Sequence, residues 1–125
     1  MNVLLVAAGG AIGASLRYLA GVWLASRLGA DFPWGTFFVN VTGSFLIGVV
    51  LVLVEGGSLP AGARLFLAVG VMGGYTTFSS YSYETLGLLM DGELAKAFVY
   101  VFGQLLIGFV GVYLGVVVGR LLGVV

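Results

Sequence analysis

The chain alternates long apolar stretches with short polar segments. The apolar stretches cover residues 3–28, 35–54, 65–90 and 97–118. Each is close to or longer than the ~20 residues that an α-helix needs to cross the hydrocarbon core of a bilayer. Polar segments such as Glu55 to Pro60 and Asp91 to Glu93 separate them. The pattern predicts an all-α membrane protein, with residues 1–125 forming one domain of four transmembrane helices.

Small and polar residues recur every fourth position within these stretches and therefore share helix faces. The first stretch carries Gly9, Gly13, Arg17 and Gly21, the second Thr36, Asn40, Ser44 and Gly48, and the fourth Tyr100, Gln104 and Gly108. Small residues allow close helix packing in membranes, so these faces are predicted to meet protein. Arg17 lies near mid-span and is predicted to face the bundle interior or a watery cavity, the alternative being that its side chain reaches the interface. The polar face around Asn40 indicates either a pathway or hydrogen bonds to a neighbouring helix.

The third stretch contains Gly73-Gly74-Tyr75-Thr76-Thr77 near its middle, which is a poor helix-forming sequence. We therefore predict that this helix is broken near its middle. A break inside a membrane survives only where it is buried or lines a cavity, and it frees main-chain carbonyl groups. Such carbonyls can hold an alkali cation, as in ion filters. The alternative is a glycine kink that binds no ion.

Aromatic and hydroxyl residues follow the predicted break. Phe78 and Tyr81 are three residues apart on a helix, among Thr77, Ser79, Ser80 and Ser82. Ring edges carry partial positive charge and hydroxyl groups donate hydrogen bonds, so this mixture can attract an anion. Packing against lipid is the ordinary alternative for single aromatic residues. Glu84 lies one turn beyond Ser80, and its carboxylate could pair with a lysine or arginine at the mouth of the pathway.

Composition narrows the function classes. Charged residues make up 8% of the chain, against about 25% in a typical soluble domain. The chain has no histidine and no cysteine and a formal net charge of zero, which disfavours thiol metal sites, histidine catalysis and nucleic-acid binding. We expect the first stretch to be a retained helix rather than a signal peptide. The basic residues of the predicted loops are equally divided between the two sides of the membrane. Chance among so few residues explains this division, and so does insertion of the chain in both orientations.

Three segments together resemble the Fluc or CrcB family of fluoride channels. They are residues 9–18 around Arg17, residues 35–45 around Asn40, and residues 73–84 from Gly73 to Glu84. They occur in family order and at family spacing in three different predicted spans, and the resemblance covers the whole chain.

The resemblance implies an antiparallel, dual-topology homodimer with two fluoride pathways in the plasma membrane, or the inner membrane of a Gram-negative cell. It also implies a structural sodium ion that is not transported, held at the dimer centre by the main-chain carbonyls of Gly73 and Thr76. The implied pathway residues are Asn40, Thr77, Phe78, Ser80, Tyr81, Glu84 and Tyr100. Arg17 matches a first-span arginine with a structural or vestibule role. Tyr81 departs from the family phenylalanine, so transport is expected to persist with an altered rate or selectivity.

Other functions agree less well with the sequence. A small multidrug exporter coupled to protons is the main alternative, but it needs a carboxylate in the first span, where this chain has Arg17. A membrane scaffold does not account for the polar and aromatic third span. An intramembrane enzyme would need a Ser-Lys or carboxylate pair, which is not apparent, so we expect no enzymatic activity. The nucleotide-binding Gly-x-x-x-x-Gly-Lys-Ser/Thr motif is absent, which predicts passive flow.

Overall fold

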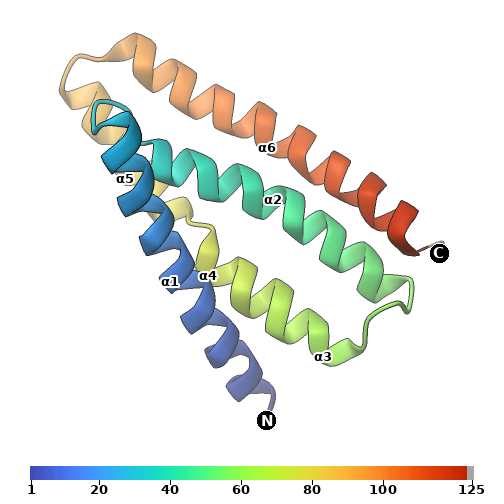
Figure 1. The fold of residues 1–125 in the computed structure, drawn as a ribbon. Coiled ribbons are helices and arrows are strands. Elements are labelled where there is room, and N and C mark those ends of the chain that lie inside the picture. Colours follow the sequence, from blue (N-terminus) through green and yellow to red (C-terminus); the bar gives the residue numbers. More distant parts are fainter. Residues whose placement is uncertain (124–125) are drawn as a thin grey trace.

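The computed structural model describes residues 1–123, and these residues form helices and short connections without a strand (Figure 1). The elements are α1 (Asn2–Leu28), α2 (Trp34–Glu55), α3 (Ala61–Ala63), η1 (Arg64–Met72), α4 (Gly73–Tyr75), α5 (Phe78–Met90) and α6 (Leu94–Gly123). The predicted all-helical class is therefore confirmed.

Three helices are long and apolar enough to cross a membrane, namely α1, α2 and α6. They contain the predicted spans 3–28, 35–54 and 97–118. The predicted span over residues 65–90 is not one helix. It consists of the π-helix η1, which has nine residues and begins at Arg64, the short turn α4 and the 13-residue helix α5, while α3 precedes it. None of these segments alone reaches the ~20 residues of a membrane span.

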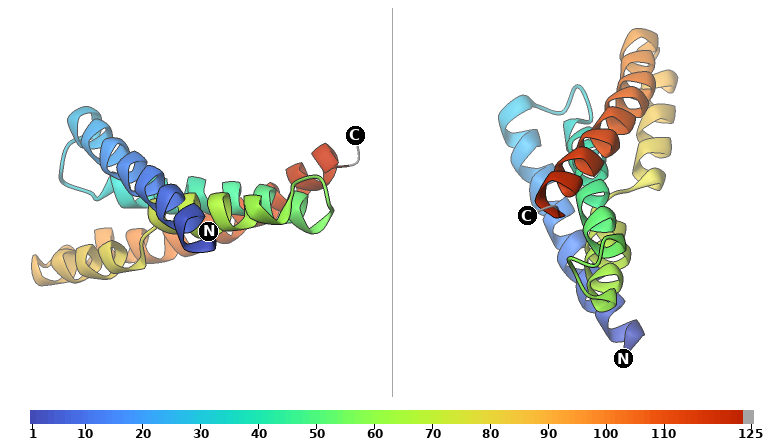
Figure 2. Two further views of the ribbon diagram at one scale, coloured as in Figure 1. Left: turned by 90° about the horizontal axis from the view of Figure 1, so that it is seen from below. Right: turned by 90° about the vertical axis from the view of Figure 1, so that its right-hand side faces the viewer.

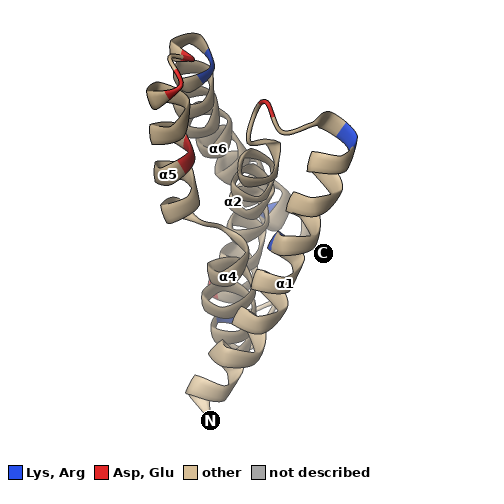
Figure 3. Cartoon of the chain, turned by 90° about the vertical axis from the view of Figure 1, so that its left-hand side faces the viewer, with Lys and Arg blue, Asp and Glu red and all other residues tan. Residues whose placement is uncertain are grey.

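The helices form an elongated bundle with both described ends of the chain toward one end (Figures 1 and 2). Helices α2 and α6 lie side by side and run in the same direction, while α1 runs the opposite way and packs on η1 and α4. Most charged side chains lie near the ends of the bundle, and long lengths of α2 and α6 carry none (Figure 3). This distribution suits helices that are surrounded by hydrocarbon.

Glycines allow these helices to approach closely. On α6, a Cβ atom at Gly115 would lie 3.0 Å from the carbonyl carbon of Phe45 on α2, and Gly48 of α2 would meet Val112 in the same way. On α1, Gly9 and Gly13 are buried against the backbone of η1. The predicted small faces of the first, second and fourth stretches therefore do face protein, as small residues in membrane helices commonly do.

Candidate functional site

The helical backbone is interrupted at Thr76 and Thr77. Both residues are extended, with φ −86° and ψ 156° at Thr76 and φ −151° and ψ 118° at Thr77. The hydroxyl oxygen of Thr77 accepts the Ser80 N–H at 3.1 Å and so caps the first turn of α5. Threonine at this position satisfies one of the N–H groups that a helix start leaves unpaired.

The interruption falls after the double glycine rather than at it. Gly73 and Gly74 remain helical in α4. A Cβ atom at Gly74 would lie 2.6 Å from the carbonyl oxygen of Gly10 and 3.1 Å from the nitrogen of Ala14. Gly74 therefore serves close packing against α1. The segment Gly73 to Thr77 in which the sequence predicts the break therefore contains the interruption, but only its two threonines are extended.

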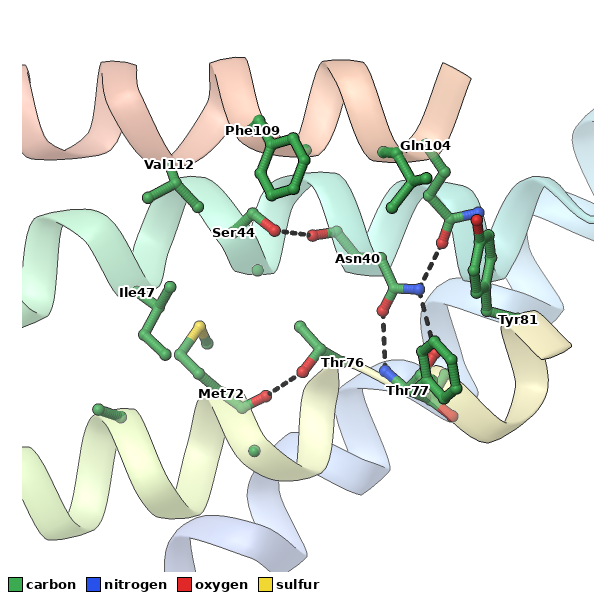
Figure 4. Close-up of a pocket in the computed structure, with 16 residues that line it drawn as sticks. Asn40, Ser44, Ile47, Met72, Thr76, Thr77, Tyr81, Gln104, Phe109 and Val112 are labelled. Atoms are coloured by element: carbon green, nitrogen blue, oxygen red, sulfur yellow. Dashed lines mark hydrogen bonds between the residues drawn. The ribbon is translucent and has the colours of Figure 1, made fainter. Parts of the chain in front are cut away.

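Asn40 on α2 holds the interrupted backbone by its side-chain amide. Its Oδ1 accepts the Thr77 N–H at 2.8 Å, and its Nδ2 donates to the Thr77 carbonyl at 3.1 Å. Nδ2 also donates to Oε1 of Gln104 on α6, so three elements meet at this one side chain (Figure 4). Asn40 thus satisfies the Thr77 N–H, which the break leaves without a helical partner, and adds a second hydrogen bond to the Thr77 carbonyl. Such satisfaction is the condition for irregular backbone inside a membrane.

The carbonyls of Gly73 and Thr76 lose their ordinary helical donors. In a continuous α-helix the Gly73 carbonyl would accept from the N–H of Thr77, and the Thr76 carbonyl from the N–H of Ser80. Here the Thr77 N–H bonds to Asn40 and the Ser80 N–H bonds to the Thr77 hydroxyl. Neither oxygen therefore has its usual helical donor. Main-chain carbonyl oxygens are ligands of the kind that bind alkali cations, so these two oxygens suit the predicted sodium ion.

The side chain of Arg17 on α1 reaches the turn α4, which precedes the break. Its Nε donates to the Gly74 carbonyl at 3.1 Å, and the side chain is half-buried. An arginine in this position stabilises another freed carbonyl while its remaining N–H groups stay available. Of the two alternatives from the sequence, the structure agrees with the side chain facing the protein interior.

The aromatic residues after the break lie beside one another. The ring centroids of Phe78 and Tyr81 are 5.8 Å apart, and those of Tyr81 and Tyr100 are 5.5 Å apart. The Tyr81 hydroxyl donates to the Val101 carbonyl of α6 at 3.1 Å. The extra hydroxyl, compared with phenylalanine, therefore joins α5 to α6 while the ring stays in the aromatic row.

Glu84 is bound by a hydroxyl group and not by a basic residue. The fully buried Tyr100 donates its hydroxyl hydrogen to Oε1 of Glu84 at 2.9 Å. Within residues 1–123 of one copy Glu84 forms no ion pair with a lysine or arginine, and the ion pair formed there is between Lys96 and Glu93 at 3.9 Å. Lys96 lies at the start of α6 beside Glu93, which explains why it pairs locally.

Two cavities collect most of the predicted site residues. A cavity of about 430 Å³ beside the break is lined, among others, by Asn40, Gly73, Thr76, Thr77, Phe78 and Tyr81. A second cavity of about 700 Å³ between α1, the start of α2 and α5 is lined, among others, by Arg17, Ser80 and Glu84. Tyr100 lines neither and is buried between helices.

Gln104 also lines the cavity beside the break, and the predicted site residues did not include it. Its spacing could have indicated it, since it lies four residues after Tyr100 on the same polar face of α6. The sequence could not indicate that this face meets Asn40, because the pairing of α2 with α6 is a tertiary contact.

The fold and these cavities define a class: a multi-pass helical membrane protein whose mainly apolar cavity at a helix break carries a few polar and aromatic side chains. A family model described as "CrcB-like protein, Camphor Resistance (CrcB)" matches residues 4–116. The chain belongs to this family, as its resemblance predicted.

Similar proteins agree over nearly the whole chain. It is 60% identical over 112 residues to the "Fluoride-specific ion channel FluC" of a strain of Thermus thermophilus, covering 90% of this chain and 88% of that protein. It is 50% identical over 123 residues to the protein of the same name from a strain of Roseiflexus, covering 98% and 99%. Membership in a family of ion channels agrees with the predicted lack of enzymatic activity and with a multi-pass protein of the plasma membrane.

Proposed function

We propose that this protein is a passive, fluoride-selective channel that releases fluoride from the cell. The observation that carries the proposal is the cavity at the break, where the rings of Phe78 and Tyr81 lie beside the amides of Asn40 and Gln104. Similar proteins named as fluoride-specific ion channels support the same function.

The chemistry of the cavity suits a small and strongly hydrated anion. Fluoride leaves water only if other groups replace its hydrogen bonds, since an uncompensated charge in an apolar medium is very costly. Amide and hydroxyl donors replace part of the hydration shell, and the positive edges of aromatic rings attract the ion between donors. The chain has no phosphate-binding loop of the Walker type, which fits a pathway that does not use ATP.

The first expected outcome is fluoride release from liposomes that contain the purified protein. Vesicles loaded with potassium fluoride should lose fluoride within seconds after a potassium ionophore dissipates the voltage, whereas vesicles loaded with chloride should retain it. A fluoride or chloride electrode reads both. Equal release of the two anions, or no release from protein that elutes as a folded species, would contradict the proposed function.

We further propose that two copies assemble antiparallel. In one copy Phe78 is 78% exposed although it belongs to the proposed pathway, and Gly73 is also exposed. A second copy would cover both and complete the pathway wall. The even division of basic loop residues permits insertion in both orientations.

Single cysteines offer a direct test of orientation, because the natural chain has none. Ser58 and Glu93 are exposed and lie in opposite connections of the bundle. Each of the variants Ser58→Cys and Glu93→Cys should react with a membrane-impermeant maleimide in part from outside intact cells and in part only after permeabilisation. Complete reaction of one variant and none of the other from outside would exclude dual topology.

The freed carbonyls of Gly73 and Thr76 support a structural sodium ion between the two copies. Each copy would contribute these two oxygens, and hard oxygen donors suit an alkali cation. The ion would stabilise the two breaks against each other without moving through the pathway. Sodium should accordingly raise the unfolding temperature of the assembled protein more than equal N-methylglucamine, and an equal unfolding temperature in both would contradict it.

A further inference from the structure

The backbone at the break is fixed to α2 on both of its sides. Three consecutive residues each contact one position of α2, namely Tyr75 with Thr42, Thr76 with Gly43 and Thr77 with Asn40. With about 3.6 residues per turn, position 43 lies between positions 40 and 42 around the helix axis. The segment therefore follows part of the circumference of α2. Asn40 holds the backbone after the turn α4, and the contact with Tyr75 holds the turn itself.

The direction of the hydrogen bond between Tyr75 and Thr42 follows from a second contact of Thr42. The Thr42 hydroxyl donates its one hydrogen to the Phe38 carbonyl at 2.7 Å. Its oxygen lies 2.8 Å from the Tyr75 hydroxyl and therefore accepts from it. Tyr75 is buried and packs with Val71 and Met72. The bond to α2 thus gives a buried tyrosine hydroxyl the partner that it needs.

Tyr75 lies on the opposite side of the turn from Gly73. Residues two positions apart on a helix point about 200° apart, and here Gly73 is exposed whereas Tyr75 is buried. Gly73 and Thr76 are the residues whose carbonyls lose their helical donors at the break. Tyr75 is therefore a fixed point within the segment 73–76, and it lies away from the exposed side on which a second copy and an ion would approach.

We propose that Tyr75 is a positioning residue for the sodium site, and that its hydrogen bond to Thr42 holds the turn α4 so that the carbonyls of Gly73 and Thr76 are prearranged for the ion. The inference rests on the proposed sodium ion and adds the residues that set its affinity. Without the bond the turn populates other conformations. The apparent affinity then falls in proportion to the fraction of molecules that keep the binding arrangement.

Sodium-dependent stabilisation of the assembled protein measures this affinity. The unfolding temperature is recorded in detergent while sodium chloride replaces N-methylglucamine chloride at constant ionic strength, and the sodium concentration that gives half of the maximal rise is compared between variants. Tyr75→Phe and Thr42→Val each remove the bond with little change of shape. Each should raise this concentration about threefold to tenfold, as expected for one hydrogen bond between neutral groups.

Two further variants serve as controls. Thr42→Ser keeps the acceptor hydroxyl and should match the wild-type sodium dependence. Tyr113→Phe removes a hydroxyl from an exposed position of α6 and should also leave it unchanged. The double variant Tyr75→Phe/Thr42→Val should bind sodium no more weakly than either single variant, because both substitutions remove the same bond.

The possible results distinguish the inference from the sodium proposal on which it rests. A merely structural role of Tyr75 would lower the unfolding temperature equally with and without sodium and leave the half-maximal concentration unchanged, and this result would overturn the inference alone. Losses that add in the double variant would also overturn it, because the two hydroxyls would then act separately. No effect of sodium on the wild-type protein would contradict the proposed ion itself, and the inference with it.

Discussion

Replacing Asn40 with aspartate should strongly lower fluoride efflux and loosen the start of α5. The substitution keeps an oxygen for the Thr77 N–H but places a second oxygen against the Thr77 carbonyl and Oε1 of Gln104. Two hydrogen bonds become repulsive contacts between acceptors in a half-buried place. Breaking a buried polar network in this way costs on the order of 3 kcal/mol, which lowers the equilibrium constant between the intact and the loosened break about hundredfold.

Two measurements check this prediction in parallel. Liposome efflux reports the pathway, and amide hydrogen exchange reports the backbone, since the Thr77 N–H loses protection when its partner weakens. Asn2, the other asparagine of the chain, lies exposed at the start of α1 and provides the control Asn2→Asp. Wild-type efflux in Asn40→Asp, with unchanged exchange over residues 76–80, would show that the amide does not hold the break.

The helices were predictable because the bilayer imposes a length on apolar segments. The predicted spans 3–28 and 35–54 agree with α1 and α2 within about one residue at each end. The fourth stretch was predicted to end at residue 118, before Arg120, but α6 continues to Gly123. A long basic side chain at the end of a helix can reach the interface, so the charge does not terminate the helix.

The contacts within the site were less predictable, because periodicity shows which residues share a face and not which element they meet. The polar face with Asn40 could be recognised, yet its partner Thr77 lies 37 residues away on another segment. The same limit applies to Glu84, whose partner within one copy is the hydroxyl of Tyr100. It also explains the omission of Gln104, whose partner Asn40 lies on another helix.

Replacing Gly13 with alanine should destabilise the protein more than the same change at Gly10. A Cβ atom at Gly13 would collide with the Val71 carbonyl oxygen and lie 2.9 Å from the Tyr75 nitrogen, whereas a Cβ atom at Gly10 meets nothing within 4 Å. At both positions alanine favours the helical conformation over glycine by up to about 1 kcal/mol of free energy. At Gly13 this gain is outweighed, because backbone atoms cannot rotate aside and α1 must move away from η1.

The expected loss at Gly13 is roughly 1–3 kcal/mol or more, as for other insertions into packed interiors. Thermal unfolding of the purified protein in one detergent should show a lower midpoint for Gly13→Ala and an equal or higher midpoint for Gly10→Ala. Efflux should fall with stability in the first variant, because Val71 and Tyr75 belong to the segment that leads to the break at Thr76. Equal midpoints for the two variants would mean that α1 does not need close contact with η1, and the position of Arg17 beside the Gly74 carbonyl would then require another explanation.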